Sequence, residues 1–165
     1  MKSIYIKQGM SSLVVTGLIT GGSIIGTLLT RDITVRAISN TNSSIINMLS
    51  ENLWGENLLK STVDKLDILY KLEVIESYLL ELPDEINENK TIQKALDGIH
   101  DMCQKIHVEL TNIKQKISDH YLKYFYYFRT LDLTYDMALL ENHVYNLDHR
   151  FKLFLSICQN KKLNC

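Results

Sequence analysis

Proline, alanine and recognisable catalytic motifs are scarce in this 165-residue sequence, which contains one proline and three alanines. The low proline content excludes a collagen-like rod. With 18 basic and 19 acidic residues, the net charge is −1, so the chain as a whole is not a generic polyanion binder. Its hydrophobic content of 45% excludes a disordered tail. The length instead fits one folded domain that buries a core without structural metals.

No motif in the sequence indicates an enzyme. Gly21 and Gly26 have the glycine spacing of a phosphate-binding loop, but Thr27 and Leu28 stand where lysine and then serine or threonine are required. No Ser-His-Asp arrangement can be assembled from residue order, and neither a CxxC nor an HExxH pattern is present. We therefore expect a non-enzymatic protein with no cofactor and no metal.

One helical face carries four residues of the types that bind zinc, at spacings of three, three and four. They are Asp97, His100, Cys103 and His107. Ligands on a single helix normally need another ligand from elsewhere in the chain. Cys103 also lies on an apolar seam. We interpret the histidines as solvated and Cys103 as a buried structural thiol.

The N-terminal head differs from the rest of the chain. Five of the seven glycines lie in the first 26 residues, and residues 8–30 carry no charge. This length is sufficient for a helix that spans a bilayer, although the many serines and threonines make the hydropathy borderline. Glycines four residues apart let transmembrane helices approach closely. The glycines with this spacing are Gly17, Gly21, Gly22 and Gly26.

We favour a membrane anchor for residues 1–32. A segment buried inside a protein assembly is the second interpretation, and a signal peptide without a convincing cleavage site is the third. Residues 33–50 are uncharged except for Arg36 and rich in serine and asparagine. This composition predicts a linker that ends in a short amphipathic turn.

Residues 51–165 carry apolar side chains at steps of three and four, the pattern of helices that pack in a bundle. Pro83 interrupts the pattern. Asp132 and Thr134 are suitable N-caps within 130–134, where we place a tight turn and a reversal of the chain. We expect helices at about 51–82, 90–130 and 133–160. The predicted fold is all-α, with an N-terminal glycine-rich transmembrane helix followed by an antiparallel three-helix, coiled-coil-like bundle.

The expected hairpin also suggests a disulfide. If the chain reverses near Asp132, facing residues have numbers that add to about 264. Cys103 and Cys158 nearly satisfy this relation and both lie on the seam, so they could be bonded in an oxidising compartment. The alternative is two buried thiols.

Six aromatic residues crowd into eight positions near the end of the second predicted helix. They are Tyr121, Tyr124, Phe125, Tyr126, Tyr127 and Phe128. These rings form either a thick core near the hairpin tip or a docking surface for another protein. Stacking on nucleic acid is disfavoured, because only Lys123 and Arg129 interleave with the rings and the body of the chain is acidic.

These features favour a structural or adaptor protein, anchored by its head in a membrane or larger assembly and docking partners through its bundle. We expect its partners to be other proteins in a homo- or hetero-oligomer, with no nucleic acid. Residues encoded by AT-rich codons are abundant, as in many large DNA viruses. One concrete version is therefore a minor capsid or membrane-linking component of a virion. The alternative is a membrane-active protein that forms pores or promotes fusion.

Overall fold

The computed structural model describes residues 31–50, 57–82, 89–128 and 130–162, and every regular element in these ranges is helical. The elements are α1 (Arg31–Ser50), α2 (Asn57–Leu66), α3 (Ile68–Leu80), α4 (Lys90–Tyr121), the short 3-10 helix η2 (Tyr126–Phe128) and α5 (Thr134–Lys162). The all-α prediction is confirmed for this part of the chain.

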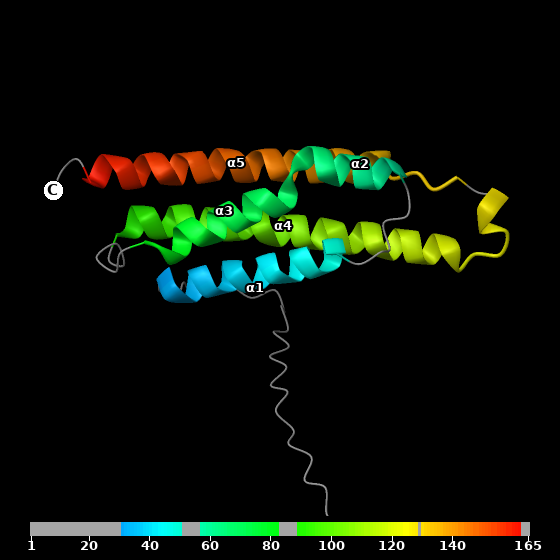
Figure 1. Cartoon of the computed structure of the whole chain (residues 1–165), viewed down its shortest axis with the longest axis horizontal. Coiled ribbons are helices and arrows are strands. Elements are labelled where there is room, and N and C mark those ends of the chain that lie inside the picture. The colour runs from blue at the N-terminus through cyan, green and yellow to red at the C-terminus, as the bar shows by residue number, and fades with distance from the viewer. Residues whose placement is uncertain (1–30, 51–56, 83–88, 129, 163–165) are drawn as a thin grey trace, which may run out of the picture.

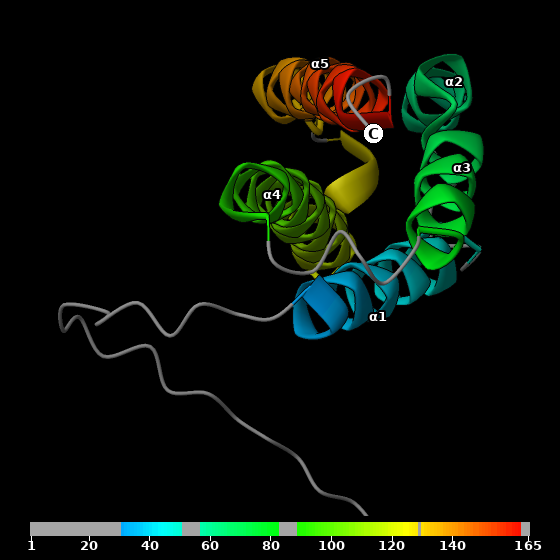
Figure 2. The ribbon, with the colours of Figure 1, turned by 90° about the vertical axis from the view of Figure 1, so that its left-hand side faces the viewer.

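The long helices α4 and α5 form an antiparallel hairpin, and the other helices lie along it (Figure 1). Helix α1 packs against α4 and α3, while α2 and α3 both contact α5. Seen from the end, α1, the α2–α3 pair, α4 and α5 surround a common interior (Figure 2). The described part of the bundle therefore has four helical rods, one of which is broken into α2 and α3, so the expectation of a three-helix bundle is wrong.

The heptad pattern correctly identified the core faces of α4 and α5. On α4 the buried seam runs from Ile92 to His120, and on α5 it runs from Met137 to Cys158, with Leu133 buried just before α5. Leu96, Leu110 and Leu140 are fully buried within it. The side chain of Asn89 caps α4 by accepting hydrogen bonds from two backbone N–H groups of its first turn.

The expected linker at residues 33–50 is wrong, because these residues belong to α1. Val35, Ile38 and Ile45 bury their side chains against the bundle. The intervening inward positions are polar, including Thr34 and Asn42, both fully buried. Polar side chains on the inward face hid the helical seam and made its composition resemble that of a linker.

The expected continuous helix over 51–82 is also interrupted. Asp67 adopts a left-handed conformation with φ 51°, which separates α2 from α3. The break changes which residues face the core: Ile68 is buried, whereas Leu69 is 40% exposed. A strict heptad would have placed Leu69 inside.

Polar contacts set the direction of α1 in the bundle. Near its start, Thr34 Oγ1 accepts a hydrogen bond of 2.8 Å from Gln93 Nε2 on α4. Further along, Ser44 Oγ lies 2.8 Å from His107 Nε2. The residue numbers therefore increase in the same direction along both helices. Helix α1 runs parallel to α4 and begins near the start of α4.

Candidate docking site

The far end of the α4–α5 hairpin is closed by an ion pair. Lys116 Nζ lies 2.6 and 2.8 Å from the two carboxylate oxygens of Asp136, which is only 5% exposed. This hydrogen bond raises the pKa of Lys116. Burial, reinforced by the nearby charge of Asp136, raises the pKa of the neighbouring carboxyl of Glu109. These contacts tie α4 to α5 and support the segment that connects them.

Beyond this pair, the chain leaves the helix earlier than predicted. Helix α4 ends at Tyr121 instead of near residue 130. The backbone N–H groups of Leu122 and Lys123 donate to the carbonyls of Ser118 and His120, which closes the last turn. The expected tight turn at 130–134 is therefore wrong, because α4 has already ended at Tyr121 and η2 lies between α4 and α5. Only the predicted role of Asp132 at the start of α5 is retained: its carboxylate accepts a hydrogen bond from Thr134 N.

The connection turns at Phe125, whose φ of 60° lies in the left-handed region. For a residue with a Cβ atom this conformation costs roughly 1–2 kcal/mol. It allows the chain to fold into η2 at the end of the hairpin instead of continuing as a helix. We call residues 121–128 the aromatic tip.

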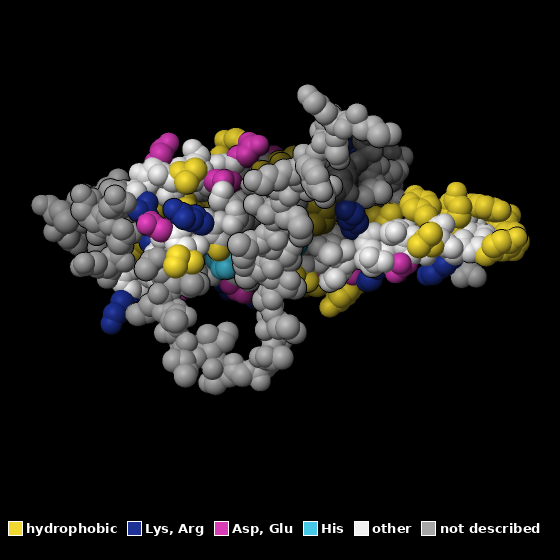
Figure 3. All heavy atoms as spheres, turned by 90° about the horizontal axis from the view of Figure 1, so that it is seen from below, with side chains coloured by type: hydrophobic (Ala, Val, Ile, Leu, Met, Phe, Trp, Pro, Cys, Tyr) yellow, Lys and Arg dark blue, Asp and Glu magenta, His cyan; other side chains and the backbone are white. Residues whose placement is uncertain are grey.

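Side chains of the aromatic tip point away from the core. All six predicted aromatic residues are exposed, from 38% for Tyr126 to 82% for Tyr124, and Leu122 is also 82% exposed. Apolar side chains cover the protruding end of the molecule seen from below (Figure 3). The interpretation of these rings as a thick core is wrong, because none of them is buried.

Instead of packing into the core, the rings pack mainly on one another. Edge-to-face pairs join Tyr121 to Tyr126 at 5.3 Å, Tyr124 to Phe125 at 4.5 Å and Tyr126 to Tyr127 at 5.2 Å between ring centroids. Such pairs are stabilised by the ring quadrupoles. The tip is therefore an ordered aromatic cluster that exposes its outer surface.

No protein-family model, curated protein or solved structure matches the chain. Function has to be inferred from its own side chains. Leu122 is the tip residue that sequence reasoning missed, because we considered only aromatic residues there. The sequence did indicate that the whole segment is apolar, because Lys123 is the only polar residue in 121–128 apart from the tyrosine hydroxyls.

The disulfide considered between Cys103 and Cys158 is contradicted, and the alternative of two buried thiols applies. Both residues are buried thiols. The contacts of Arg150 with Gly98 and Asp101 show that facing residues have numbers adding to about 250, which puts the two cysteines about 16 Å apart along the hairpin. A disulfide requires Cα atoms within about 7 Å of each other. The error arose from placing the chain reversal too late.

The four residues considered as zinc ligands have separate environments, and His100 is half-buried with a pKa lowered by that burial. Asp97 Oδ1 accepts a hydrogen bond from Gln93 Nε2, His107 contacts Ser44, and Cys103 is fully buried with a pKa raised to about 12 by burial. Among the described residues, no three His, Cys, Asp or Glu side chains gather as metal ligands would.

The Ser44–His107 pair has the spacing of a nucleophile and its base. However, no carboxylate in the described part of the chain is hydrogen bonded to His107 to orient it. The pair joins α1 to α4, and we interpret it as a structural contact.

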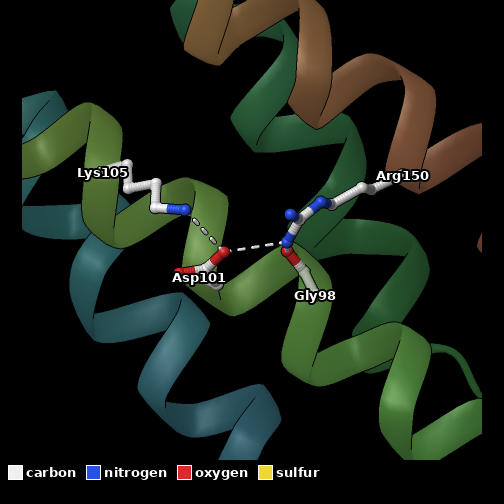
Figure 4. A network of polar contacts seen from close by, with 4 residues as sticks. All are labelled: Gly98, Asp101, Lys105 and Arg150. Atoms are coloured by element: carbon white, nitrogen blue, oxygen red, sulfur yellow. Dashed lines mark hydrogen bonds and ion pairs between the residues drawn. The ribbon is translucent and has the colours of Figure 1, made fainter.

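A groove of about 410 Å³ runs over the outer face of α4 and α5 at the opposite end from the tip. Its lining is mostly apolar and includes Ala95, Leu153 and Ile157. Beside it, Arg150 Nη1 donates to Gly98 O at 2.6 Å and to Asp101 Oδ2 at 2.9 Å (Figure 4). Lys105 also forms an ion pair with Asp101. The network therefore joins α4 to α5 beside the groove.

In Asp101 two effects on the pKa oppose each other. Partial burial disfavours the ionised carboxyl, but hydrogen bonds from Lys105 and Arg150 outweigh it and lower the pKa. The network therefore favours the charged form of Asp101 and stabilises the hairpin at neutral pH.

The predicted packing glycines Gly17, Gly21, Gly22 and Gly26 lie outside the described residues, and so does the whole predicted anchor. Within the described ranges, no helix combines the length and apolar character that crossing a membrane requires.

Proposed function

We propose that this protein is a non-enzymatic structural adaptor, held in a membrane or larger assembly by its N-terminal head and docking a partner through the aromatic tip. The exposed aromatic cluster at one end of a helical bundle is the observation that carries the proposal. Buried apolar seams and side-chain bridges between helices suit a rigid spacer.

The size of the aromatic tip supports an interaction. Seven apolar or aromatic side chains of about 150–250 Å² each, exposed by 38% to 82%, present on the order of 900 Å². Contiguous apolar patches on soluble monomers rarely exceed a few hundred Å², and larger ones mark contacts with proteins or membranes. The tip is therefore larger than the scattered apolar exposure of an ordinary surface.

The positions of the two ends support a spacer. Helix α1 follows directly after the uncharged head, and its first turns lie beside the first turns of α4. About 40 Å of helix separates Gln93, near this end of α4, from Tyr121. In Figure 1 the start of α1 and the tip accordingly lie toward opposite ends of the molecule.

Photocrosslinking in the source cells tests the docking end. We would place a benzophenone amino acid at Tyr124 in the full chain, with a matched control at Tyr145, which is 70% exposed on the side of α5. We expect adducts at position 124 and few at position 145. Equal labelling at both positions, or none at position 124, would contradict a docking tip.

Carbonate extraction tests the anchor separately. The full chain should stay with the membrane pellet, whereas a chain with Ile19→Arg and Leu28→Arg should wash off, because a charge at the centre of a span costs about 2.5–3.5 kcal/mol on the insertion scale. If the unmodified chain washes off, the head packs in protein instead of lipid. Release of dye from liposomes by the purified chain would favour the membrane-active alternative.

A further inference from the structure

The charge of the aromatic tip differs from that of the body that carries it. Residues 120–131 contain Lys123 and Arg129 and no acidic residue. The rest of the sequence from residue 51 onward is rich in acids, which include the exposed Asp119 and Asp132 on either side of the tip. An anionic surface would attract the tip and repel the body, so this charge pattern favours end-on contact.

The chemistry of the exposed side chains matches the boundary between lipid and water. Tyrosines combine an apolar ring with a polar hydroxyl and are enriched at membrane interfaces. Phe128 and Leu122, which are 81% and 82% exposed, add purely apolar side chains to the tip. Basic side chains beside such residues are attracted to anionic lipids, with an effect that decays over a Debye length.

The shape of the tip fits the same partner. The segment protrudes beyond the other helices as a narrow end (Figures 1 and 3). The groove on the outer face of α4 and α5 is not lined by any tip residue. A convex end with outward-facing rings can enter a headgroup layer to a depth of about 5–10 Å without requiring a complementary pocket.

From these observations we infer that the aromatic tip inserts into the headgroup layer of an anionic lipid bilayer. This inference rests on the proposed function in one respect, since it names the partner of the proposed docking end. Because the start of α1, which follows the head in sequence, lies about 40 Å from the tip along the bundle, the protein would bridge its anchoring site and a second lipid surface.

Tryptophan fluorescence can report on the tip alone. The chain has a single tryptophan, Trp54, so Trp54→Phe provides a silent background. Phe128→Trp then places a probe on the tip, and Tyr145→Trp places a matched probe on the exposed side of α5. Both full-length proteins would be mixed with phosphatidylcholine vesicles, with and without phosphatidylserine, and with brominated lipids as quenchers.

We expect tryptophan at position 128 to shift to shorter wavelength and to be quenched by brominated lipid in the anionic vesicles, while tryptophan at position 145 stays unchanged. Raising salt from about 0.1 M to about 1 M shortens the Debye length from about 10 Å to about 3 Å and should weaken binding. Tyr124→Ser, added to the tip probe, should lower vesicle affinity by about tenfold, because one buried ring is lost.

Three results would overturn the inference. The first is no change at position 128 while circular dichroism shows an intact bundle, and the second is equal quenching at both positions. The third is a shift at position 128 that depends on protein concentration without lipid, because the partner would then be a second copy of the chain. Adding Ile19→Arg and Leu28→Arg distinguishes the two proposals: tip quenching should persist even if the anchor is lost.

Discussion

Replacement of Asn42 by leucine should stabilise the protein. Asn42 is fully buried on the inward face of α1. Its Nδ2 donates to the carbonyl oxygen of Leu72 over a long 3.4 Å, and its Oδ1 has no hydrogen-bond partner among the described residues. A buried acceptor without a partner costs about 1–3 kcal/mol. Leucine has the same branched shape and the same number of side-chain atoms, so it can fill the site without a polar penalty.

The expected gain is about 2 kcal/mol in the free energy of unfolding, because the lost hydrogen bond is long and contributes little. At this chain length such a gain raises the melting temperature by about 4–8 °C. Urea unfolding followed by circular dichroism measures the gain in free energy of unfolding, provided that the dependence of this free energy on urea concentration is the same in both proteins. Ser43→Leu is the matched control, because Ser43 is the exposed neighbour on the same helix. It should change stability by less than about 0.5 kcal/mol.

Two outcomes would refute this reasoning. If Asn42→Leu and Ser43→Leu have the same small effect, residues 33–50 behave as the linker that their composition suggested, and α1 does not pack here. If Asn42→Leu destabilises the protein while Ser43→Leu does not, the buried amide is satisfied in solution and its retention has a structural benefit.

Three further predictions concern titrating and reactive groups. Burial raises the pKa of Glu109 in the folded state above its unfolded value of about 4.5, so the folded state loses stability as pH rises from the unfolded pKa to the folded pKa. In urea titrations, Glu109→Gln should therefore be more stable than the unmodified protein at pH 7 but not below pH 4. The exposed control Glu141→Gln should show no such difference between the two pH values. Cys103, with a pKa of about 12, should resist iodoacetamide at pH 8 until urea unfolds the chain, as peptide mass mapping would show. Arg150→Met should lower stability at pH 7 by at most about 1 kcal/mol, because Asp101 is 46% exposed. The loss should become smaller in acid unfolding curves as pH falls through the lowered pKa of Asp101, leaving only the contribution of the hydrogen bond to Gly98 O.

The sequence allowed the core of α4 and α5 to be predicted because apolar and charged side chains alternate there with little ambiguity. Ile99, Ile106 and Leu140 are fully buried at the expected positions. Helix α1 was missed because its inward face uses polar residues such as Thr34, whose partner Gln93 lies 59 positions away. Such pairs become visible only when two helices are placed side by side, since neither residue indicates burial by itself.

The location of the aromatic tip was predictable, whereas its conformation was not. Apolar spacing extended the predicted helix past Tyr121, since periodicity cannot show where the facing helix begins. Helix α5 starts at Thr134 and leaves the preceding rings without a helical neighbour to cover them. Aromatic residues are only moderate helix formers, so loss of that packing removes their main reason to stay helical.

The aromatic tip also departs from the rules that the remainder of the described bundle follows. Its rings are solvent-exposed although aromatic side chains gain free energy when buried. Phe125 holds a left-handed conformation that glycine or asparagine would adopt at lower cost. Neither feature improves the stability of the isolated chain, and the exposed rings also create an aggregation risk. A segment that is unfavourable for folding but ordered by its own ring contacts is typical of a binding site, where local stability is lost in return for a surface that another molecule covers.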